Sequence, residues 1–249
     1  MSRYSRHLDL PGFSPEHLSS IRTADVLVVG AGGLGAATIT YLAGAGVGRL
    51  RIVDDDVVED TNLCRQLLFC VQDVGRSKAD VAGERVRVIN PDVEVVALPM
   101  RLTQASVAEM LKGVSVVVDC SDNLSTKYLL GRAANRHRIP CVWGALGQYA
   151  GSCSVVMPGG PCFECAFGPE EQVPEWPAAG EQGIFAPVCG VIGSLAAGEV
   201  LKVITGLGST LAGYIAVLDL LTTDLTRIPL FCDPQCQCCA AGETVLKQY

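Results

Sequence analysis

The sequence predicts an α/β fold in which a mainly parallel sheet is extended by antiparallel strands. Three observations support this fold class. Short apolar runs typical of buried strands alternate with segments of helical spacing over about the first 140 residues. One run, at residues 114–120, is typical of a continuous apolar strand that is buried on both faces. A glycine-rich turn, "GAGGLG" at residues 30–35, stands between the first strand and the first helix.

The elements of the first half follow one another in a regular order. We expect strands at residues 25–30, 49–56, 92–99 and 114–120, and helices at residues 33–46, 77–90 and 104–113. The second half has a different sequence pattern, because residues 140–160 and 213–230 each predict two strands joined by a turn. These strands are expected to extend the same sheet in antiparallel fashion.

Two further segments complete the organisation of the chain. Residues 186–206 form the longest apolar stretch, but Glu199 and Lys202 interrupt it, so that a buried core helix is expected and not a membrane span of about 20 apolar residues. Residues 168–186 hold three prolines and four acids, which predict a mobile loop; the alternative is a solvated surface excursion.

Composition limits the classes of function. A chain of 249 residues with 49% hydrophobic residues can bury one large core. A formal charge of -7 and a pI near 5.0 give no general attraction to nucleic acid or to anionic membranes. The start of the chain lacks the apolar core of a secretory signal. We therefore expect a cytoplasmic protein whose 12 cysteines are reduced thiols and metal ligands.

The glycine-rich turn is the first candidate binding site. Gly30, Gly32 and Gly35 fit the GxGxxG spacing, and such a turn places backbone N–H groups and a helix N-terminus against phosphate. Asp54 and Asp56 close the next strand, where a ribose-binding acid is expected. The alternatives are a tight strand-to-helix turn and a solvated strand end. Taken alone, the turn also fits a nicotinamide-dependent oxidoreductase.

Polar and basic residues after the second strand argue against an oxidoreductase. The segment "TNLCRQ" contains Asn62, Arg65 and Gln66, and Lys78 follows at the start of a helix. Arginine forks and lysine charges neutralise a triphosphate during nucleotidyl transfer, whereas hydride transfer needs neither. As isolated residues, each of them would more often be a surface charge.

Two acids, Asp119 and Asp122, stand at the end of the strand expected at residues 114–120. Asp119 and Asp122 lie at the carboxyl edge of the sheet, where open α/β folds bind their ligands. A carboxylate there can hold Mg²⁺ between phosphates. The alternative for Asp122 is a cap for the helix that follows it.

The cysteines give a second strong signal. Cys162 with Cys165, and Cys236 with Cys239, form two CxxC pairs, the pattern of a closed structural zinc site, although Cys238 complicates the second pair. Other cysteines lie in apolar sequence and are expected to be packed and unreactive: Cys64, Cys120, Cys141, Cys153 and Cys189.

Taken in order, these motifs resemble the ThiF/MoeB/HesA family of ubiquitin-activating-enzyme-like adenylyltransferases. The motifs are "RYSR", "GAGGLG", "DDD", "TNLCRQ", "GRSK", "DCSDN", CxxC and CxxC, and they run through nearly the whole chain. The resemblance implies a Rossmann-like domain that binds ATP, Mg²⁺ and Zn²⁺. It also implies that the carboxyl-terminal Gly-Gly of a ubiquitin-like sulfur carrier attacks the α-phosphate, giving an acyl-adenylate and pyrophosphate.

The resemblance assigns roles to individual residues. It implies that Asp54 holds the ribose and Asp122 the magnesium, and that Arg6 reaches the site of the neighbouring subunit in a homodimer. The implied nucleotide-binding residues are Gly30, Gly32, Gly33, Gly35, Asp54, Asp56, Asn62, Arg65, Gln66, Lys78, Asp122 and Asn123. The implied catalytic residues are Arg6, Arg65, Lys78 and Asp122, and the implied zinc ligands are Cys162, Cys165, Cys236 and Cys239. Residues 1–249 would form one domain, with a nucleotide-binding half to about residue 140 and a carrier- and zinc-binding half from 141.

The sequence departs from the family at one position. Some relatives have a cysteine in the loop after the first CxxC pair, but the segment "GPEEQVPEWPAAGEQG" has none, so we expect no transfer of the carrier through a loop thiol. The chain stops soon after the second pair, and we expect sulfur to come from a separate donor protein. A catalytically silent carrier-binding scaffold is the remaining alternative, although no matched catalytic position is lost. The identity of the carrier stays open.

Overall fold

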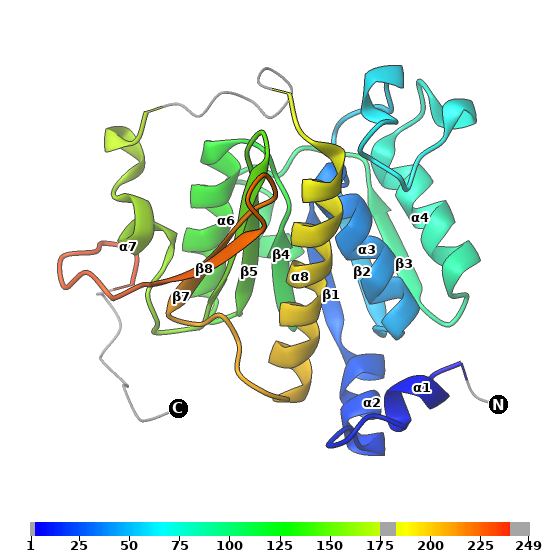
Figure 1. The fold of residues 1–249 in the computed structure, drawn as a ribbon, viewed down its shortest axis with the longest axis horizontal. Coiled ribbons are helices and arrows are strands. Elements are labelled where there is room, and N and C mark those ends of the chain that lie inside the picture. Colours follow the sequence, from blue (N-terminus) through cyan, green and yellow to red (C-terminus); the bar gives the residue numbers. More distant parts are fainter. Residues whose placement is uncertain (1–2, 175–182, 240–249) are drawn as a thin grey trace.

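The computed structural model describes residues 3–174 and 183–239, so residues 175–182 of the predicted loop lie outside the described residues. Eight strands form one sheet with helices on both faces (Figure 1). The strands are β1 (Asp25–Val29), β2 (Arg49–Val53), β3 (Glu94–Leu98), β4 (Val116–Asp119), β5 (Cys141–Leu146), β6 (Ala150–Val156), β7 (Tyr214–Asp219) and β8 (Asp224–Pro229). The α-helices are α1 (Ser5–Leu8), α2 (Pro15–Thr23), α3 (Gly33–Ala45), α4 (Lys78–Ile89), α5 (Val107–Met110), α6 (Leu124–Arg136), α7 (Phe163–Phe167) and α8 (Ala186–Thr205). Short 3₁₀ turns are η1 (Asp60–Asn62), η2 (Val71–Asp73) and η3 (Glu170–Gln172).

The order of the strands confirms the predicted fold class. Across the sheet the order is β3-β2-β1-β4-β5-β6-β7-β8. Strands β1 to β5 pair in parallel, and β6, β7 and β8 follow in antiparallel pairs. The chain leaves β1 toward β2 and β3 on one side and later adds β4 and β5 on the other. This reversal is a topological switch point, and open α/β sheets bind ligands there, beyond the carboxyl ends of the strands.

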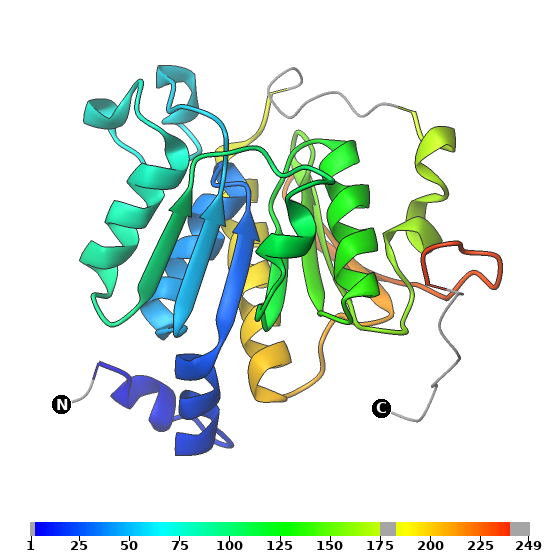
Figure 2. The same cartoon turned by 180° about the vertical axis from the view of Figure 1, so that it is seen from behind.

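Both faces of the sheet are covered because the central strands are apolar on both sides. Val26 and Val28 of β1 belong to the core under α3, α4 and α8, whereas Leu27 and Val29 belong to the core under α5 and α6. Successive side chains of a strand point to opposite faces, so a strand between two helical layers must be apolar throughout. Figure 1 shows α3 and α8 in front of the sheet, and Figure 2 shows the opposite face.

Helix α8 is long and apolar enough to cross a membrane by length and composition alone. In the structure it packs against α3, β5 and β6, and Val188, Ile192 and Val200 along it are buried. Its carboxylate Glu199 is 1% exposed and accepts a hydrogen bond from the backbone N–H of Leu211 at 2.7 Å. These contacts are those of a core helix, as the two charges within the apolar stretch predicted.

The helix predicted at residues 104–113 is shorter than expected. It consists of one turn, α5, and before it Thr103 and Ser106 exchange hydrogen bonds between backbone and side chain at 3.0 and 3.3 Å. The N–H of Val107 then donates to the carbonyl oxygen of Thr103 at 2.9 Å, so the first helical hydrogen bond closes over this local turn. Gly113, with φ of +73°, then redirects the chain into β4.

Candidate active site

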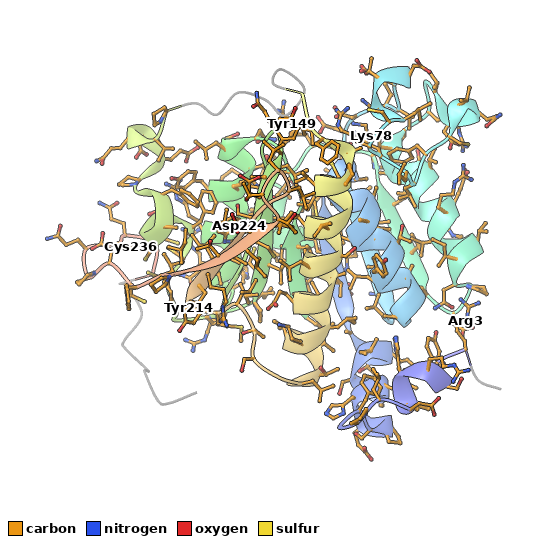
Figure 3. The ribbon with its side chains drawn as sticks, viewed as in Figure 1. Arg3, Lys78, Tyr149, Tyr214, Asp224 and Cys236 are labelled. Atoms are coloured by element: carbon orange, nitrogen blue, oxygen red, sulfur yellow. The ribbon has the colours of Figure 1, made fainter. Side chains whose placement is uncertain are left out.

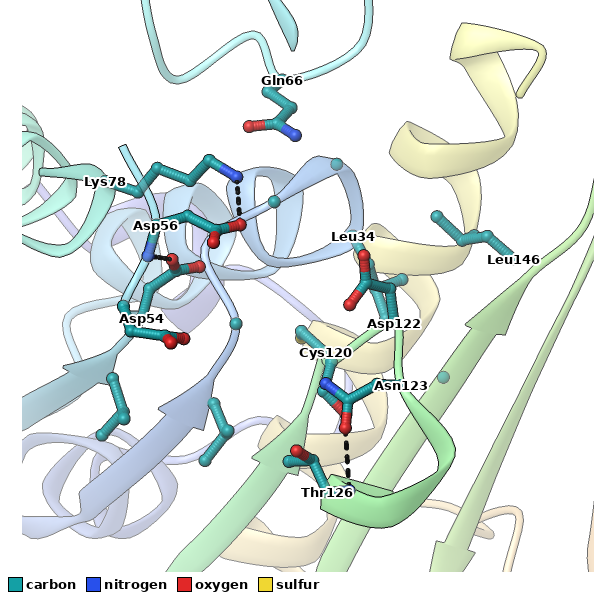
Figure 4. A pocket seen from close by; sticks show the side chains of 18 of the residues that line it. Leu34, Asp54, Asp56, Gln66, Lys78, Cys120, Asp122, Asn123, Thr126 and Leu146 are labelled. Carbon is teal, nitrogen blue, oxygen red and sulfur yellow. Dashed lines mark hydrogen bonds and ion pairs between the residues drawn. The ribbon is translucent and has the colours of Figure 1, made fainter. Parts of the chain in front are cut away.

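A pocket of about 420 Å³ opens beyond the carboxyl ends of the parallel strands, at the switch point between β1 and β4. Figure 4 shows part of its lining from close by. Its polar and glycine lining is Gly30, Gly32, Gly33, Asp54, Asp55, Asp56, Arg65, Gln66, Lys78, Arg101, Ser121, Asp122, Asn123, Thr126, Lys127 and Gly144. Its remaining lining, which is largely apolar, is Val29, Leu34, Val53, Met100, Leu102, Cys120, Ala145, Leu146, Ile184 and Cys189. Most of the residues proposed from the sequence therefore meet in one place.

The glycine-rich turn forms the floor of this pocket. Gly30 has φ of +94°, and a Cβ there would lie 2.7 Å from the carbonyl oxygen of Cys120. A Cβ at Gly35 would lie 2.0 Å from the carbonyl oxygen of Gly30, so Gly35 lets α3 approach the turn although it does not line the pocket. Gly32 is the N-cap of α3, whose first N–H groups therefore lack partners within the helix. The turn and the helix dipole together provide a site for an anion such as phosphate.

Asp54 joins the glycine turn to the end of β2. Its two carboxylate oxygens accept hydrogen bonds from the backbone N–H of Ala31 at 2.7 Å and of Asp56 at 2.9 Å. Burial raises the pKa of the Asp54 carboxyl above its ordinary value, and these hydrogen bonds partly oppose that shift. Asp54 therefore shapes the turn, and a contact with ribose stays a prediction.

Lys78 and Asp56 form an ion pair at the edge of the pocket. The Lys78 ammonium donates to the Asp56 carboxylate at 2.9 Å, and the Lys78 side chain is 8% exposed whereas that of Asp56 is 69% exposed (Figure 4). Lys78 begins α4, directly after Ser77, whose hydroxyl caps that helix. Lys78 thus lines the pocket with its ammonium paired to Asp56.

Arg65 and Gln66 follow η1 and line the pocket. Asn62 accepts a hydrogen bond from the N–H of Glu59 at 3.1 Å with its side chain, and its carbonyl accepts from the N–H groups of Arg65 and Gln66 at 3.0 and 2.9 Å. Asn62 does not line the pocket, so it holds the turn and is not placed to contact a ligand there. Gln66 is 4% exposed, and its side-chain oxygen has no hydrogen-bond partner among the residues that the structure describes. A buried, unpartnered amide facing a pocket is a natural contact for a bound ligand.

Asp122 and Asn123 occupy the loop after β4, and the structure excludes the helix cap as the role of Asp122. The side chain of Asn123 caps α6 by accepting from the N–H of Thr126 at 2.9 Å. Asp122 is exposed, lines the pocket and is not the cap (Figure 4). Its carboxylate is therefore available to a ligand.

Five polar residues of the pocket were not singled out from the sequence: Asp55, Arg101, Ser121, Thr126 and Lys127. Lys127 is in the first turn of α6, where a lysine is usually a surface charge, and yet it is 2% exposed. Lys127 lies four positions after Asn123, so the two residues lie on the same side of the first turn of α6. This spacing was the signal in the sequence that could have placed Lys127 near the site.

Arg6 does not reach the pocket of its own chain. It lies on α1, beyond the amino ends of the strands, whereas the pocket lies beyond their carboxyl ends (Figure 1). Its side chain is 90% exposed and pairs with Asp9 at 3.5 Å. A role for Arg6 in catalysis thus requires a second subunit, and it stays a prediction.

The four cysteines of the two CxxC pairs meet in one cluster. Their Sγ atoms lie within 4.8 Å of one another, and the sulfur–sulfur distances are 3.5 Å between Cys162 and Cys236 and 3.3 Å between Cys165 and Cys239. Cys238 is outside this group, and its carbonyl accepts a hydrogen bond from the Asn135 amide at 2.7 Å. Four converging thiols suit tetrahedral Zn²⁺. The cluster lies away from the pocket, as the labels of Cys236 and Lys78 in Figure 3 show.

The other cysteines differ in exposure. Cys120, Cys141, Cys153 and Cys189 are buried, as predicted. Burial raises the pKa of the Cys120 thiol to about 12, so this thiol stays protonated at the pocket wall. Cys64 is exposed, contrary to the prediction, because its turn faces outward when Arg65 and Gln66 face the pocket.

Comparison with known proteins agrees with this geometry. A sequence profile of the ThiF family matches residues 4–240. The "Sulfur carrier protein adenylyltransferase" of Thermus thermophilus is 40% identical over 98% of this chain and 92% of the relative. The "SAMP-activating enzyme E1" of Haloferax volcanii is 38% identical over 97% of this chain and 90% of the relative.

Two further matches are more limited. The mouse "Adenylyltransferase and sulfurtransferase MOCS3" is 40% identical over 98% of this chain, which covers 54% of that longer relative. The crystal structure of Escherichia coli MccB with ATP superposes with a TM-score of 0.84 over 96% of this chain and 75% of that chain, and at 23% identity this likeness shows the fold alone. Because the family profile spans nearly the whole described chain and relatives of similar length are 38–40% identical to it, the chain belongs to the ThiF family.

Proposed function

We propose that this protein is an adenylyltransferase that uses ATP to activate the carboxyl-terminal glycine of a ubiquitin-like sulfur carrier protein. The observation that carries the proposal is the meeting of Arg65, Lys78 and Asp122 around a glycine turn in one pocket. The similarity to a sulfur carrier protein adenylyltransferase over nearly the full length supports it. A nicotinamide-dependent oxidoreductase would need none of these three charged residues at its phosphates.

The residues of the pocket fit Mg-ATP. The N–H groups at the start of α3 and the cations Arg65 and Lys78 would neutralise the phosphates, and the unpartnered oxygen of Gln66 is open to a donor on the ligand or its hydration shell. Asp122 would hold Mg²⁺, which screens the charge of the triphosphate. The glycines Gly30, Gly32 and Gly33 allow the phosphates to approach the backbone, and Met100, Leu102 and Val53 offer an apolar wall to the base.

The proposed reaction is a nucleophilic displacement at the α-phosphorus of ATP. A carboxylate oxygen of the carrier's terminal glycine forms a bond to the α-phosphorus, and the bond from that phosphorus to the bridging oxygen breaks, so pyrophosphate leaves with the electron pair. Arg65 and Lys78 stabilise the charge that develops on the leaving phosphates. The products are the carrier acyl-adenylate and pyrophosphate. Because adenylylation supplies no sulfur, a separate donor must provide it.

The remaining features complete the proposal. Residues 1–249 act as one domain, in which the first half, to about residue 140, binds the nucleotide, and the second half binds the carrier and zinc. Cys162, Cys165, Cys236 and Cys239 hold a structural Zn²⁺. The protein works as a homodimer in the cytoplasm, and Arg6 of each subunit serves the site of its partner.

Exchange of labelled pyrophosphate into ATP tests the proposal. The assay uses a panel of purified ubiquitin-like carriers that end in Gly-Gly, each paired with a control carrier that lacks the terminal glycine. We expect exchange with at least one intact carrier and none with its truncated control. Exchange that does not depend on a carrier, or binding of a carrier without exchange, would overturn the proposed reaction; the second result would identify a scaffold.

A further inference from the structure

A buried ion pair lies in the wall of the pocket, next to the loop that carries Asp122. The side chains of Lys127, on α6, and Asp119, at the end of β4, are each 2% exposed, and their charged atoms are 3.5 Å apart. The Lys127 ammonium also donates a hydrogen bond of 2.7 Å to the carbonyl oxygen of Gly144, on β5. The lysine therefore connects the carboxyl ends of two neighbouring strands where the pocket begins.

Asp119, the partner of Lys127, also binds the loop after β4. Its Oδ1 atom accepts hydrogen bonds from the backbone N–H of Ser121 at 2.9 Å and from the Ser121 hydroxyl at 2.6 Å. Ser121 directly precedes Asp122. On the other side of Asp122, Asn123 is fixed by the cap of α6. The backbone on both sides of Asp122 is thus held, and one of the two anchors depends on Lys127.

A simple packing role does not account for this arrangement. Burying a lysine and an aspartate costs several kcal/mol of desolvation, and an apolar pair of similar size would often be as stable. The pair instead fixes geometry, because one ammonium joins the end of β5 to the carboxylate that organises the loop. Such fixed supporting contacts are what keep a ligand-binding carboxylate in place.

We propose that Lys127 is a positioning residue for Asp122. Through Asp119 and Ser121 it holds the loop after β4 at a fixed distance from the end of β5, so that the Asp122 carboxylate faces the Mg²⁺ of bound Mg-ATP. This inference rests on the proposed function, in which Asp122 holds the magnesium. Lys127 itself need not contact the nucleotide.

The test measures how much Mg²⁺ strengthens the binding of ATP. Isothermal titration calorimetry gives the affinity for ATP with Mg²⁺ and with a chelator, and the exchange assay gives the Mg²⁺ concentration for half-maximal rate. In Lys127→Met we expect the Mg²⁺-dependent gain in affinity to fall about tenfold, and the half-maximal Mg²⁺ concentration to rise by a similar factor, which corresponds to about 1.4 kcal/mol. Lys127→Arg, which keeps the charge, should recover most of both.

A matched control separates positioning from loss of stability. Glu199 is a buried charge of α8 that pairs with Lys202 and does not line the pocket. Glu199→Gln should lower the melting temperature without changing the Mg²⁺ dependence. If Lys127→Met does not fold, Ser121→Ala and Asp119→Asn interrupt the same chain of contacts with little change in side-chain volume. We expect the same shift in Mg²⁺ dependence in both variants.

The outcomes distinguish this inference from the proposed function. If the folded variants keep the Mg²⁺ dependence of the wild type while the wild type catalyses exchange, Lys127 only stabilises the fold and the inference is wrong. If the wild type shows neither carrier-dependent exchange nor tighter binding of ATP with Mg²⁺, the proposed function itself fails.

Discussion

Two adjacent residues, Asp122 and Asn123, divide two tasks at the end of β4. The side chain of Asn123 accepts a hydrogen bond from the N–H of Thr126 and caps the start of α6. Asp122 is exposed at the pocket and has no part in the cap. From the sequence, a cap was an alternative only for Asp122, and the structure assigns the cap to Asn123. This division predicts opposite consequences for two neighbouring substitutions.

Asp122→Ala should lower carrier-dependent exchange on the order of 100-fold, because a preorganised charge at the phosphates stabilises the transition state. Its free energy of unfolding should change by less than about 0.5 kcal/mol, as is usual for an exposed side chain. Asn123→Ala should lower the free energy of unfolding by about 1 kcal/mol, since it removes a helix cap. Urea denaturation and the exchange assay measure both quantities. Near-normal exchange by Asp122→Ala would remove this residue from the site.

At the scale of single residues, the sequence predicted which side chains gather but not what each contacts. Arg65, Gln66 and Lys78 line one pocket, and their contacts with a nucleotide stay a prediction. Asn62 could not be separated from them by sequence, because a residue that supports a turn and one that binds a ligand share the same motif. Lys127 was missed because burial of a lysine depends on a partner, here Asp119, that lies eight positions away in sequence and on another element.

At the scale of elements, the cysteine cluster joins α7 to the last described turn of the chain. Cys162 is the N-cap of α7 and Cys165 lies within it, whereas Cys236 and Cys239 come from residues after β8. Phe163 of α7 is buried against Tyr128 and Trp143, so α7 already has an anchor in the core. A metal at the cluster would in addition tie the residues after β8 to α7.

We expect about one zinc ion per chain in protein purified under reducing conditions. Cys162→Ser should lose the metal and lower the melting temperature, because it removes one of four ligands. Cys238→Ser is the matched control, since Cys238 lies beside the cluster but outside its four ligands. Elemental analysis and thermal denaturation give the two readouts. Retention of zinc by Cys162→Ser together with its loss from Cys238→Ser would mean that the ligand set is wrong.

A second junction between elements involves Asp73, whose side chain is 3% exposed in η2. It pairs with Arg85 of α4 at 2.6 Å and accepts a hydrogen bond from the N–H of Cys70 at 2.9 Å. Burial alone would raise the pKa of the Asp73 carboxyl, but the hydrogen bonds from the thiol and amide of Cys70 and the charge of Arg85 outweigh it, and the pKa is lowered. This junction holds the segment between Arg65 and Lys78 against α4.

A lowered pKa means that the ionised carboxylate stabilises the folded state. This contribution is present above the ordinary pKa of 3.8 and is lost as the pH falls through the lower pKa of the folded protein. Asp73→Asn should therefore lower the free energy of unfolding by about 2 kcal/mol at pH 7, as for hydrogen bonds to charged groups. The difference from the wild type should shrink as the pH falls below about 4. Urea denaturation over that range measures it, and a difference independent of pH would contradict the assigned cause.

The elements that the sequence predicted well are those with long patterns. The central strands and α3, α4 and α8 were expected within a few residues of their observed bounds. Helix α2 was missed although Ser14 and Pro15 form a typical start. Helices α1 and α7 span only 4 and 5 residues, which is too short for a helical period to be visible. Their positions depend on tertiary contacts that no local pattern records.

At the scale of the whole molecule, two of the proposed catalytic residues lie at opposite ends of the sheet. Asp122 lies at the carboxyl ends of the strands, and Arg6 lies on α1 beyond their amino ends (Figure 1). One chain cannot bring both to the same nucleotide while the sheet between them stays intact. If both act in catalysis, Arg6 must come from a partner subunit, as the resemblance to the family implies. A two-fold dimer would then have two equivalent shared sites.

Mixing two inactive variants, Arg6→Ala and Asp122→Ala, should restore part of the activity. In a mixed dimer, the chain with intact Asp122 receives an intact Arg6 from its partner, and the other site carries both defects. Random exchange at equal concentrations makes roughly half of the dimers mixed, by counting combinations in a two-fold assembly, and each of these has one intact site of two. Exchange activity should thus recover to about a quarter of the wild-type value per site.

Native mass spectrometry must first show the mixed dimer, because subunits that do not exchange cannot complement each other. The control mixture combines Asp122→Ala with Arg65→Ala, two changes that lie in the pocket of the same chain. In that mixture each chain keeps its own damaged site whatever its partner, so no activity should return. If the mixed dimer of Arg6→Ala and Asp122→Ala forms and stays as inactive as this control, Arg6 does not complete the neighbouring site. In the first mixture the two defects can fall together in one site and leave the other site intact, whereas in the control each site always carries one defect. Recovery in the first mixture alone therefore requires an arginine supplied across the dimer.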